Sequence, residues 1–196
     1  MTMQKRLAQL LKEYLATRPE YTEAFQIVRR NSIGKIWLIG GFVFRSLAQT
    51  LYGAAPPKKD VDFLVESLRD PLKLPREWSV EENLYGNPKL RKGDLAVDVV
   101  PLTNILLFRE RNRKPSIMSY LAIVPLTVQS IAYDTAAEAL IGEVGMASIL
   151  NRTVGVHNPN SLERKCETTK NPNYHGDLAA SLGFTFIGEN IRTSMI

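Results

Sequence analysis

A short apolar run that begins with two acids, "DVDFLVE" at residues 60–66, restricts the fold of this chain more than any other segment. Side chains two residues apart in a β-strand point to the same side, so Asp60 and Asp62 would present two carboxylates together. Two anions that close repel each other unless a cation lies between them. The segment therefore predicts a buried strand whose first residues either hold a cation or are solvated at a junction with a loop.

A pair of glycines precedes this strand. The apolar run at 35–41 predicts a strand that ends in Gly40 and Gly41, and the spacing of four between apolar residues predicts a helix over 42–53. Glycine lets a ligand approach the backbone, and a helix N-terminus offers free N–H groups to a phosphate. Arg45, one turn into the helix, would add a charged fork. A tight turn with Arg45 facing solvent is the competing interpretation.

A third acid lies among residues that favour burial. Asp98 stands in "LAVDVVPL", where an unpaired charge would be costly. If its strand lies beside that of Asp60, three carboxylates converge, and two divalent ions about 3.5–4 Å apart would bridge them. Magnesium commonly uses one or two carboxylates together with substrate phosphates, which predicts two Mg²⁺ ions and a nucleoside triphosphate. Asp94 is the competing acid, but its "KGD" context is typical of a turn, so Asp98 is favoured.

The remaining segments give a coarse order of elements. Leucines at helical spacing predict a helix over 3–16, whereas 127–134 is ambiguous and 159–196 is polar and then partly helical. The other predicted elements are a helix over 20–30, a loop over 54–59, a hairpin over 88–102, a strand over 138–142, a short helix over 143–151 and a last strand over 152–158. This order favours an α/β (α+β) class, a mixed β-sheet with helices packed on it.

Composition excludes several classes of protein. No apolar run reaches the ~18 residues that span a bilayer, and the N-terminus lacks an apolar signal core, so we expect an intracellular, cytoplasmic protein without membrane contact. The single cysteine, Cys166, excludes an internal disulfide framework, and two histidines, His157 and His175, are too few for a histidine-rich metal site. The net charge of +5 favours an anionic partner.

A basic segment at 108–114 has two interpretations. It contains Phe108, Arg109, Arg111, Arg113 and Lys114. Lysine and arginine on phosphates supply affinity for RNA that is independent of sequence, so the segment predicts either an RNA or phosphate contact or a solvated face.

The order of strand, glycine pair, helix, loop and D-x-D strand resembles the signature of the class II nucleotidyltransferases in the polymerase-beta-like superfamily. These include the CCA-adding enzymes and bacterial poly(A) polymerases, whose pattern is roughly G-G-x-V-R-D-x-L-L-G, then D-x-D, then a later carboxylate. The segment at 125–156 is similar to the family's "RRDFTINAMAYD" region, and 179–187 to the start of its neck helices. The residues in register with the second motif are Thr127, Ala132, Tyr133 and Asp134.

The resemblance implies a nucleotidyltransferase head over residues 1–158 and a short helical extension over 159–196. It implies that Asp60, Asp62 and Asp98 are catalytic metal ligands and that Gly40, Gly41 and Arg45 bind the nucleotide. The implied reaction moves a nucleoside monophosphate from an NTP to an acceptor hydroxyl, most simply an RNA 3′ end such as that of tRNA, and releases pyrophosphate.

The chain departs from the family pattern at three places. The family's "VRD" reads "VFRS", with Ser46 in place of the acid, its "RRD" reads "IVPL", and the neck motif E-D-x-x-R that selects CTP or ATP is not found. The resemblance therefore implies a nucleotidyl-transferring head rather than CCA addition as such. Two alternatives follow: a nucleotidyltransferase of the toxin or resistance type that modifies a protein or small molecule, and an inactive regulator that binds nucleotide or RNA.

Overall fold

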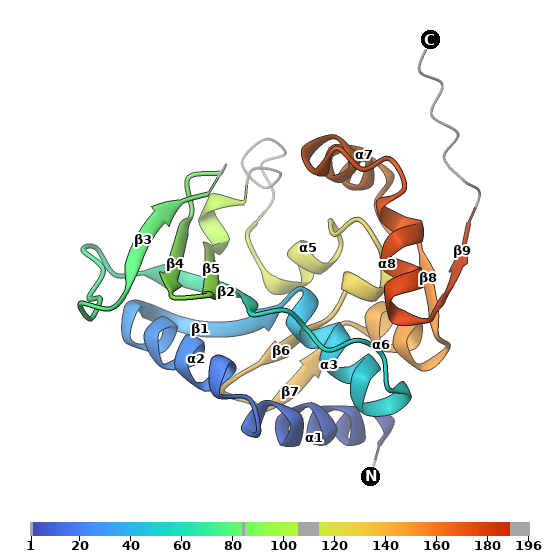
Figure 1. The fold of residues 1–196 in the computed structure, drawn as a ribbon, viewed down its shortest axis with the longest axis horizontal. Coiled ribbons are helices and arrows are strands. Elements are labelled where there is room, and N and C mark those ends of the chain that lie inside the picture. The colour runs from blue at the N-terminus through green and yellow to red at the C-terminus, as the bar shows by residue number, and fades with distance from the viewer. Residues whose placement is uncertain (1, 84, 106–113, 189–196) are drawn as a thin grey trace.

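The central element is a seven-stranded mixed sheet with the strand order β3-β4-β5-β2-β1-β6-β7 (Figure 1). A computed structural model describes residues 2–83, 85–105 and 114–188. Strands β2 and β5 are parallel, and the other neighbouring pairs are antiparallel. The strands are β1 Ser32–Ile39, β2 Asp60–Leu68, β3 Ser79–Glu82, β4 Pro88–Lys92, β5 Leu95–Pro101, β6 Ala132–Asp134 and β7 Ala139–Ile141. A second sheet pairs β8 (Thr153–Gly155) with β9 (Thr185–Ile187).

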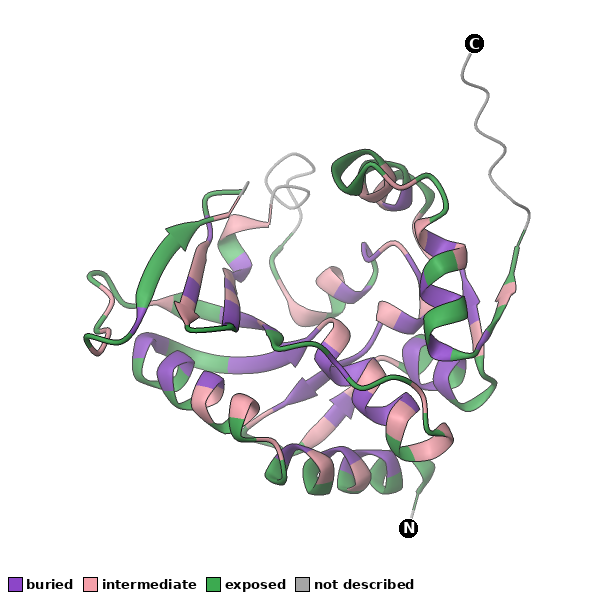
Figure 2. Ribbon diagram, in the orientation of Figure 1, coloured by how far each residue is buried: buried purple, intermediate pink, exposed green. Residues whose placement is uncertain are grey.

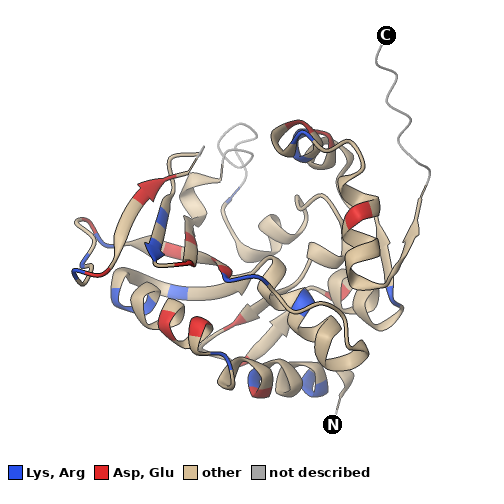
Figure 3. Cartoon of the chain, in the orientation of Figure 1, with Lys and Arg blue, Asp and Glu red and all other residues tan. Residues whose placement is uncertain are grey.

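Helices cover both sides of the large sheet. Those on the lower side in Figure 1, α1 and α2, place their charged residues outward, as Figure 3 shows. Helices α5 and α7 lie above the sheet, and α8 packs beside β8 and β9. The helices are α1 Met3–Ala16, α2 Pro19–Asn31, α3 Gly41–Tyr52, α5 Ile117–Leu121, α6 Glu143–Leu150, α7 Pro159–Thr169 and α8 Tyr174–Leu182, with 3-10 turns η1 Leu102–Asn104 and η2 Thr127–Gln129. Among the described residues, no helix is both long and apolar enough to cross a membrane.

The alternation of side chains along β2 divides the core in two. Val61, Phe63 and Val65 are fully buried in the larger cluster, on the side of α1, α2 and α3. Leu64 points the other way and joins a smaller cluster under α5, with Leu121. In Figure 2, buried residues lie along the inner sides of the helices and exposed residues lie on their outer sides. The two acids of β2 share the side of Leu64, because all three positions have the same parity.

The fold class is confirmed, and so are the helices expected at 3–16, 20–30 and 42–53, the acidic strand and the hairpin. Strand β1 begins earlier than expected, at Ser32, and its register shifts at Gly34, where a positive φ of 80° makes a bulge. The ambiguous stretch 127–134 is a 3-10 turn followed by a strand. Strands β3 and β9 and helix α5 were not predicted, and the extension expected to be helical contains α7 and α8. The division into two domains at residue 158 stays a prediction, and residues 108–113 of the basic segment lie outside the described residues.

Candidate active site

A cleft of about 950 Å³ lies above the large sheet, with α7 and α8 on its other side. The side chains of Asp60, Asp62 and Asp98 reach it from β2 and β5. The start of α3 forms one wall, and residues of α7 and α8 form another. Pockets of this size hold small-molecule ligands in many proteins. The two parts of the chain that the sequence separated at residue 158 therefore both line it.

The three carboxylates converge because of the register between β2 and β5. Asp62 lies directly beside Asp98 in the parallel pair, and Asp60 lies two residues earlier on the same side. One oxygen of each carboxylate lies within 4.8 Å of the others. Magnesium holds oxygen ligands at about 2.1 Å, so opposite ligands are about 4.2 Å apart, and small rotations would close the carboxylates on an ion. The chemistry and spacing fit the expected metal, although the role of these residues as metal ligands stays a prediction.

Two further residues that the sequence did not single out hold the third acid. Lys89 Nζ donates to Asp98 Oδ2 at 2.6 Å and to Asp60 Oδ1 at 3.4 Å, and Asn83 Nδ2 donates to Asp98 Oδ1 at 3.2 Å. Burial alone would lower the pKa of Lys89, but its hydrogen bond to Asp98 and the charges of both acids raise it. The predicted hairpin contained the signal for Lys89, because a two-residue turn at 93–94 places it opposite Asp98.

The surroundings of Asp62 strongly raise the pKa of its carboxyl group. Burial, followed by repulsion from Asp60 and Asp98, raises the pKa of Asp62 to about 7. Lys89 and Lys165 act in the opposite direction but do not overcome these effects. Near neutral pH the carboxyl therefore binds a proton about as readily as it releases one. A divalent cation bound here would favour the charged form and would shift the same equilibrium in the opposite direction to a proton.

The diglycine corner is built against these acids. Gly40 has φ 69° and ψ −153°, and a Cβ at this position would lie 2.4 Å from Asp62 Oδ2. A side chain is therefore excluded by both the backbone and the neighbouring carboxylate. Gly41 begins α3, and a Cβ there would meet only Arg45, at 3.9 Å. No side chain caps the first turn of α3, and the N–H of Val43 donates to the carbonyl of Gly40 at 3.2 Å. The N–H groups of Gly41 and Phe42 are therefore the ones that an anion in the cleft could use.

Arg45 lies on the same wall but leans toward the C-terminal helices. Its guanidinium lies 5.7 Å from the centre of the Phe44 ring, and Nη2 donates to Ser181 Oγ of α8 at 3.1 Å. Burial lowers the pKa of Arg45, and the nearby Tyr174 partly offsets this. The side chain is half-buried in the cleft wall rather than directed into bulk solvent. Its role in binding a triphosphate stays a prediction.

The departures from the family pattern have local structural explanations. Ser46 is fully buried and its hydroxyl donates to the carbonyl of Phe42 inside α3, so the position of the family's acid does not face the cleft. Ile123 and Val124 are buried and, with Pro125, give the cleft an apolar wall where the family has charged residues.

Residues of the second matched motif mostly hold the fold. Asp134 Oδ1 accepts from the N–H groups of Ala136 and Ala137 at the turn between β6 and β7. Thr127 Oγ1 accepts from the N–H of Gly155 at 2.8 Å. These hydrogen bonds give Asp134 and Thr127 a structural role, at a turn and between two elements.

The side chains that close the cleft from the C-terminal part were also missed. Gln129 Nε2 donates to the hydroxyl of Tyr174 at 2.9 Å, which joins η2 to α8. His175 is buried and packs against Phe186, with ring centres 4.6 Å apart. Asp94, the competing acid, is exposed and pairs with Lys59 at 2.7 Å, outside the carboxylate cluster.

The same architecture occurs in solved structures of other proteins. No protein-family model matches the chain, and no curated protein matches its sequence. Among solved structures, it is similar to a CCA-adding enzyme in complex with CTP, with a TM-score of 0.61 and 15% identity over 93% of this chain and 43% of that one.

Two other solved structures are similar. One is a tRNA nucleotidyltransferase complexed with a primer tRNA and an incoming ATP analog, with a TM-score of 0.52, 20% identity and coverage of 80% of this chain and 44% of that one. The other is a Thermotoga maritima CCA-adding enzyme complexed with tRNA, with a TM-score of 0.52, 17% identity and coverage of 79% and 37%. The chain thus has the fold of a nucleotidyltransferase head, which confirms the resemblance in the motifs, and it spans less than half the length of these proteins.

Proposed function

We propose that this chain is a magnesium-dependent nucleotidyltransferase that moves a nucleoside monophosphate from an NTP to the hydroxyl of an RNA 3′ end. One observation carries the proposal: Asp60, Asp62 and Asp98 meet in a cleft beside the glycine-opened N-terminus of α3. An anionic triphosphate and divalent cations are the partners that this pairing of acids and free N–H groups would accept. Similar folds occur in complexes with CTP, ATP and tRNA, which supports the same substrate classes.

The reaction is an in-line displacement at phosphorus. The acceptor oxygen forms a bond to the α-phosphorus, the bond from that phosphorus to the α–β bridging oxygen breaks, pyrophosphate leaves, and the hydroxyl proton passes to solvent. Two magnesium ions, when bound, neutralise the triphosphate and lower the pKa of the acceptor hydroxyl.

The residues of the chain position these groups. Asp60 and Asp62 would hold both ions, and Asp98 would help to hold the one nearer the acceptor. Gly40, Gly41 and Arg45 would bind the phosphates through N–H groups and a guanidinium. The contribution of the protein is placement and charge neutralisation, which account for most of the catalysis in phosphoryl transfer.

Incubation with α-labelled NTPs, Mg²⁺ and total RNA tests the proposal. We expect label in RNA, and no label with the Asp60→Ala, Asp62→Ala double variant. The Asp94→Asn variant is the matched control, because this acid lies outside the cluster. Normal transfer by the double variant would remove these aspartates from the mechanism.

A second candidate, a protein or small-molecule acceptor, follows from the apolar wall of Ile123, Val124 and Pro125. A wall without charge favours an uncharged acceptor over a phosphate backbone. The same incubation separates the candidates, because label would appear in protein or in a small molecule. NTP binding without any transfer would identify the third possibility, a regulator that binds nucleotide.

A further inference from the structure

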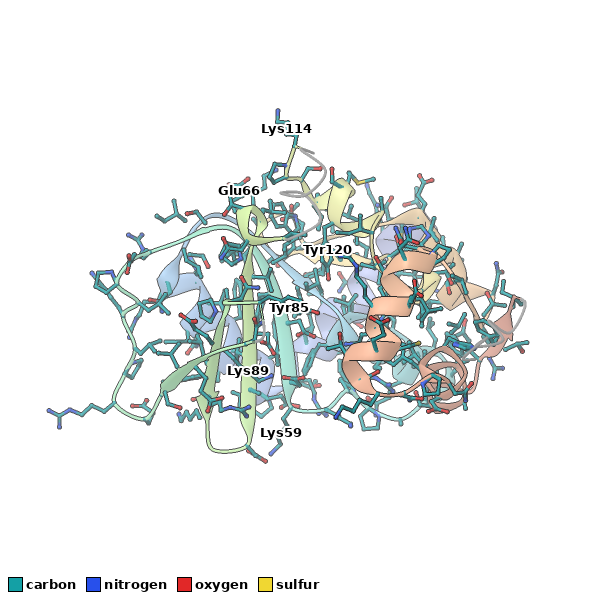
Figure 4. All side chains as sticks on the ribbon, turned by 90° about the horizontal axis from the view of Figure 1, so that it is seen from above. Lys59, Glu66, Tyr85, Lys89, Lys114 and Tyr120 are labelled. Carbon is teal, nitrogen blue, oxygen red and sulfur yellow. The ribbon has the colours of Figure 1, made fainter. Side chains whose placement is uncertain are left out.

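Lys89 joins two members of the carboxylate cluster. It lies on β4, over the central strands in Figure 4, and its ammonium lies between Asp98 and Asp60. The antiparallel register with β5 sets this contact, since Lys89 and Asp98 are direct cross-strand partners. The position is therefore a built feature of the sheet rather than one conformation of a free surface lysine.

The contacts of Asp98 leave little room for another cation. Asn83 takes one carboxylate oxygen at 3.2 Å, and Lys89 takes the other at 2.6 Å. The same ammonium reaches Asp60 at 3.4 Å, which is a longer and weaker contact. The positive charge thus lies among the oxygens that would bind a metal ion near the acceptor.

We propose that Lys89 is a positioning residue that stands in for a metal ion in the metal-free protein and leaves Asp98 and Asp60 when divalent cations bind. The ammonium and the metal then compete for the same oxygens. This inference rests on the proposed metal site, and it adds a built-in competitor that sets how much metal the site needs.

The side chain of Lys89 is suited to such an exchange. Its ammonium is a compact charge on a flexible stem, and 22% of the side chain is exposed, so it can move into solvent. Asn83 is neutral and can remain on Asp98 while a cation binds the other oxygen. Only the two contacts of the Lys89 ammonium, to Asp98 and to Asp60, must break, which makes the competition a two-state exchange.

Mn²⁺ titration followed by electron paramagnetic resonance tests the inference, with metal alone and no nucleotide. The Lys89→Met variant keeps the length of the side chain and removes its charge. We expect it to bind Mn²⁺ roughly tenfold or more tightly than the wild type, a scale on which groups around a metal site change its affinity. The Lys89→Arg variant keeps the charge and should bind much less tightly than Lys89→Met.

Lys92→Met is the matched control, since this lysine lies on the same strand and pairs with Glu23 instead. It should leave the Mn²⁺ affinity unchanged. Equal or weaker affinity in Lys89→Met would overturn the inference and leave the proposed function standing. Loss of Mn²⁺ binding in Asp62→Asn confirms the site. Binding that survives Asp62→Asn, or no binding in any variant, would overturn the metal site and the inference together.

Chemical labelling of lysines gives a second measurement that needs no variant. An amine-reactive reagent followed by mass spectrometry reports the reactivity of Lys89 with and without Mg²⁺. We expect its labelling to rise with Mg²⁺ as the ammonium leaves the carboxylates, whereas that of Lys92 stays constant. Unchanged or reduced labelling of Lys89 would contradict displacement.

Discussion

The two faces of strand β2 differ in chemical character, one being apolar and the other acidic. On one face, Val61, Phe63 and Val65 are fully buried, and Phe63 stacks on Tyr21 and Phe25 at 6.4 and 6.3 Å. On the other, two acids face a cleft that already holds a third. The apolar face stabilises the strand, and this stabilisation offsets the unfavourable grouping of like charges opposite to it. A strand can therefore present a costly site as long as its other side packs well.

The largest expected effect is on the acidic face. Asp62→Asn should lower nucleotidyl transfer by at least about 10³-fold, equivalent to about 4 kcal/mol, because an amide does not replace a charged metal ligand. Folding should be unaffected or improved, since one of three repelling charges is removed. Single-turnover rates and thermal unfolding of the same samples check both halves. An active Asp62→Asn variant would contradict the assignment of function to the acidic face and of stability to the apolar face.

A substitution on the apolar face of β2 should instead lower stability. Phe63→Ala removes a fully buried ring from an aromatic stack and should lower the free energy of unfolding by about 3–5 kcal/mol. Urea denaturation measures this change. Val80→Ala on exposed β3 is the control and should change stability by less than about 0.5 kcal/mol. A similar loss of unfolding free energy in both variants would show that the aromatic stack makes no particular contribution to stability.

Gly40→Ala tests the close approach of the backbone at the end of β1 to the side chain of Asp62 on β2. Its Cβ would collide with the carboxylate of Asp62, and its φ is positive, so we expect a loss of about 1–3 kcal/mol in stability and a loss of activity. Gly53→Ala has a positive φ but open space around it and is the matched control for backbone strain alone. Equal effects of the two substitutions would show that contact with Asp62 is unimportant.

The stability of the metal-free protein should depend on pH through Asp62. Its pKa is raised above the ordinary value, so the folded state binds more protons than the unfolded state, and this group lowers stability as pH rises from about 4 to 7. The charges that face it are Asp60, Asp98, Lys89 and Lys165. Asp62→Asn should therefore stabilise the protein at pH 8 more than at pH 5. Thermal unfolding in EDTA measures this, and a pH-independent difference would contradict it.

Asp94→Asn should give the smallest effect. Its carboxylate is exposed and pairs only with exposed Lys59 in the described structure, and such pairs contribute at most about 1 kcal/mol. Transfer and stability should both stay close to wild type. A large loss of transfer would favour Asp94 over Asp98 as the third acid, which the sequence alone left as a competitor.

The sequence predicted the parts of the fold in which apolar residues recur with a clear helical or strand periodicity. Leucines at helical spacing defined α1, and the alternation of β2 placed both acids on one side. The valine-rich context placed Asp98 in a buried strand, but its pairing with Asp62 was expected only if the two strands were neighbours, as the parallel register of β2 and β5 makes them. Lys89 was within reach of the same reasoning, because the turn residues Gly93 and Asp94 set the register of the hairpin.

Helix α7 had no such pattern. Only Leu162 is buried along it, so no apolar stripe marks its face, and its start is signalled by Asn158, which caps Ser161, and by Pro159 in the first turn. Strand β9 is three residues long and depends on its partner β8. The cleft wall that these elements support comes from tertiary packing, which single-sequence patterns do not encode.

The parallel pairing of β2 with β5 also joins acids that are distant in the sequence. Strands β3 and β4 lie between them in the chain, and in the sheet β5 lies between β4 and β2. In a newly made or partly denatured molecule in which β5 has not paired with β2, Asp60 and Asp62 lack the third acid, and contacts distant in sequence form slowly. The affinity for divalent cations would then distinguish fully folded chains from incompletely folded ones, and the incompletely folded chains would not catalyse nucleotidyl transfer.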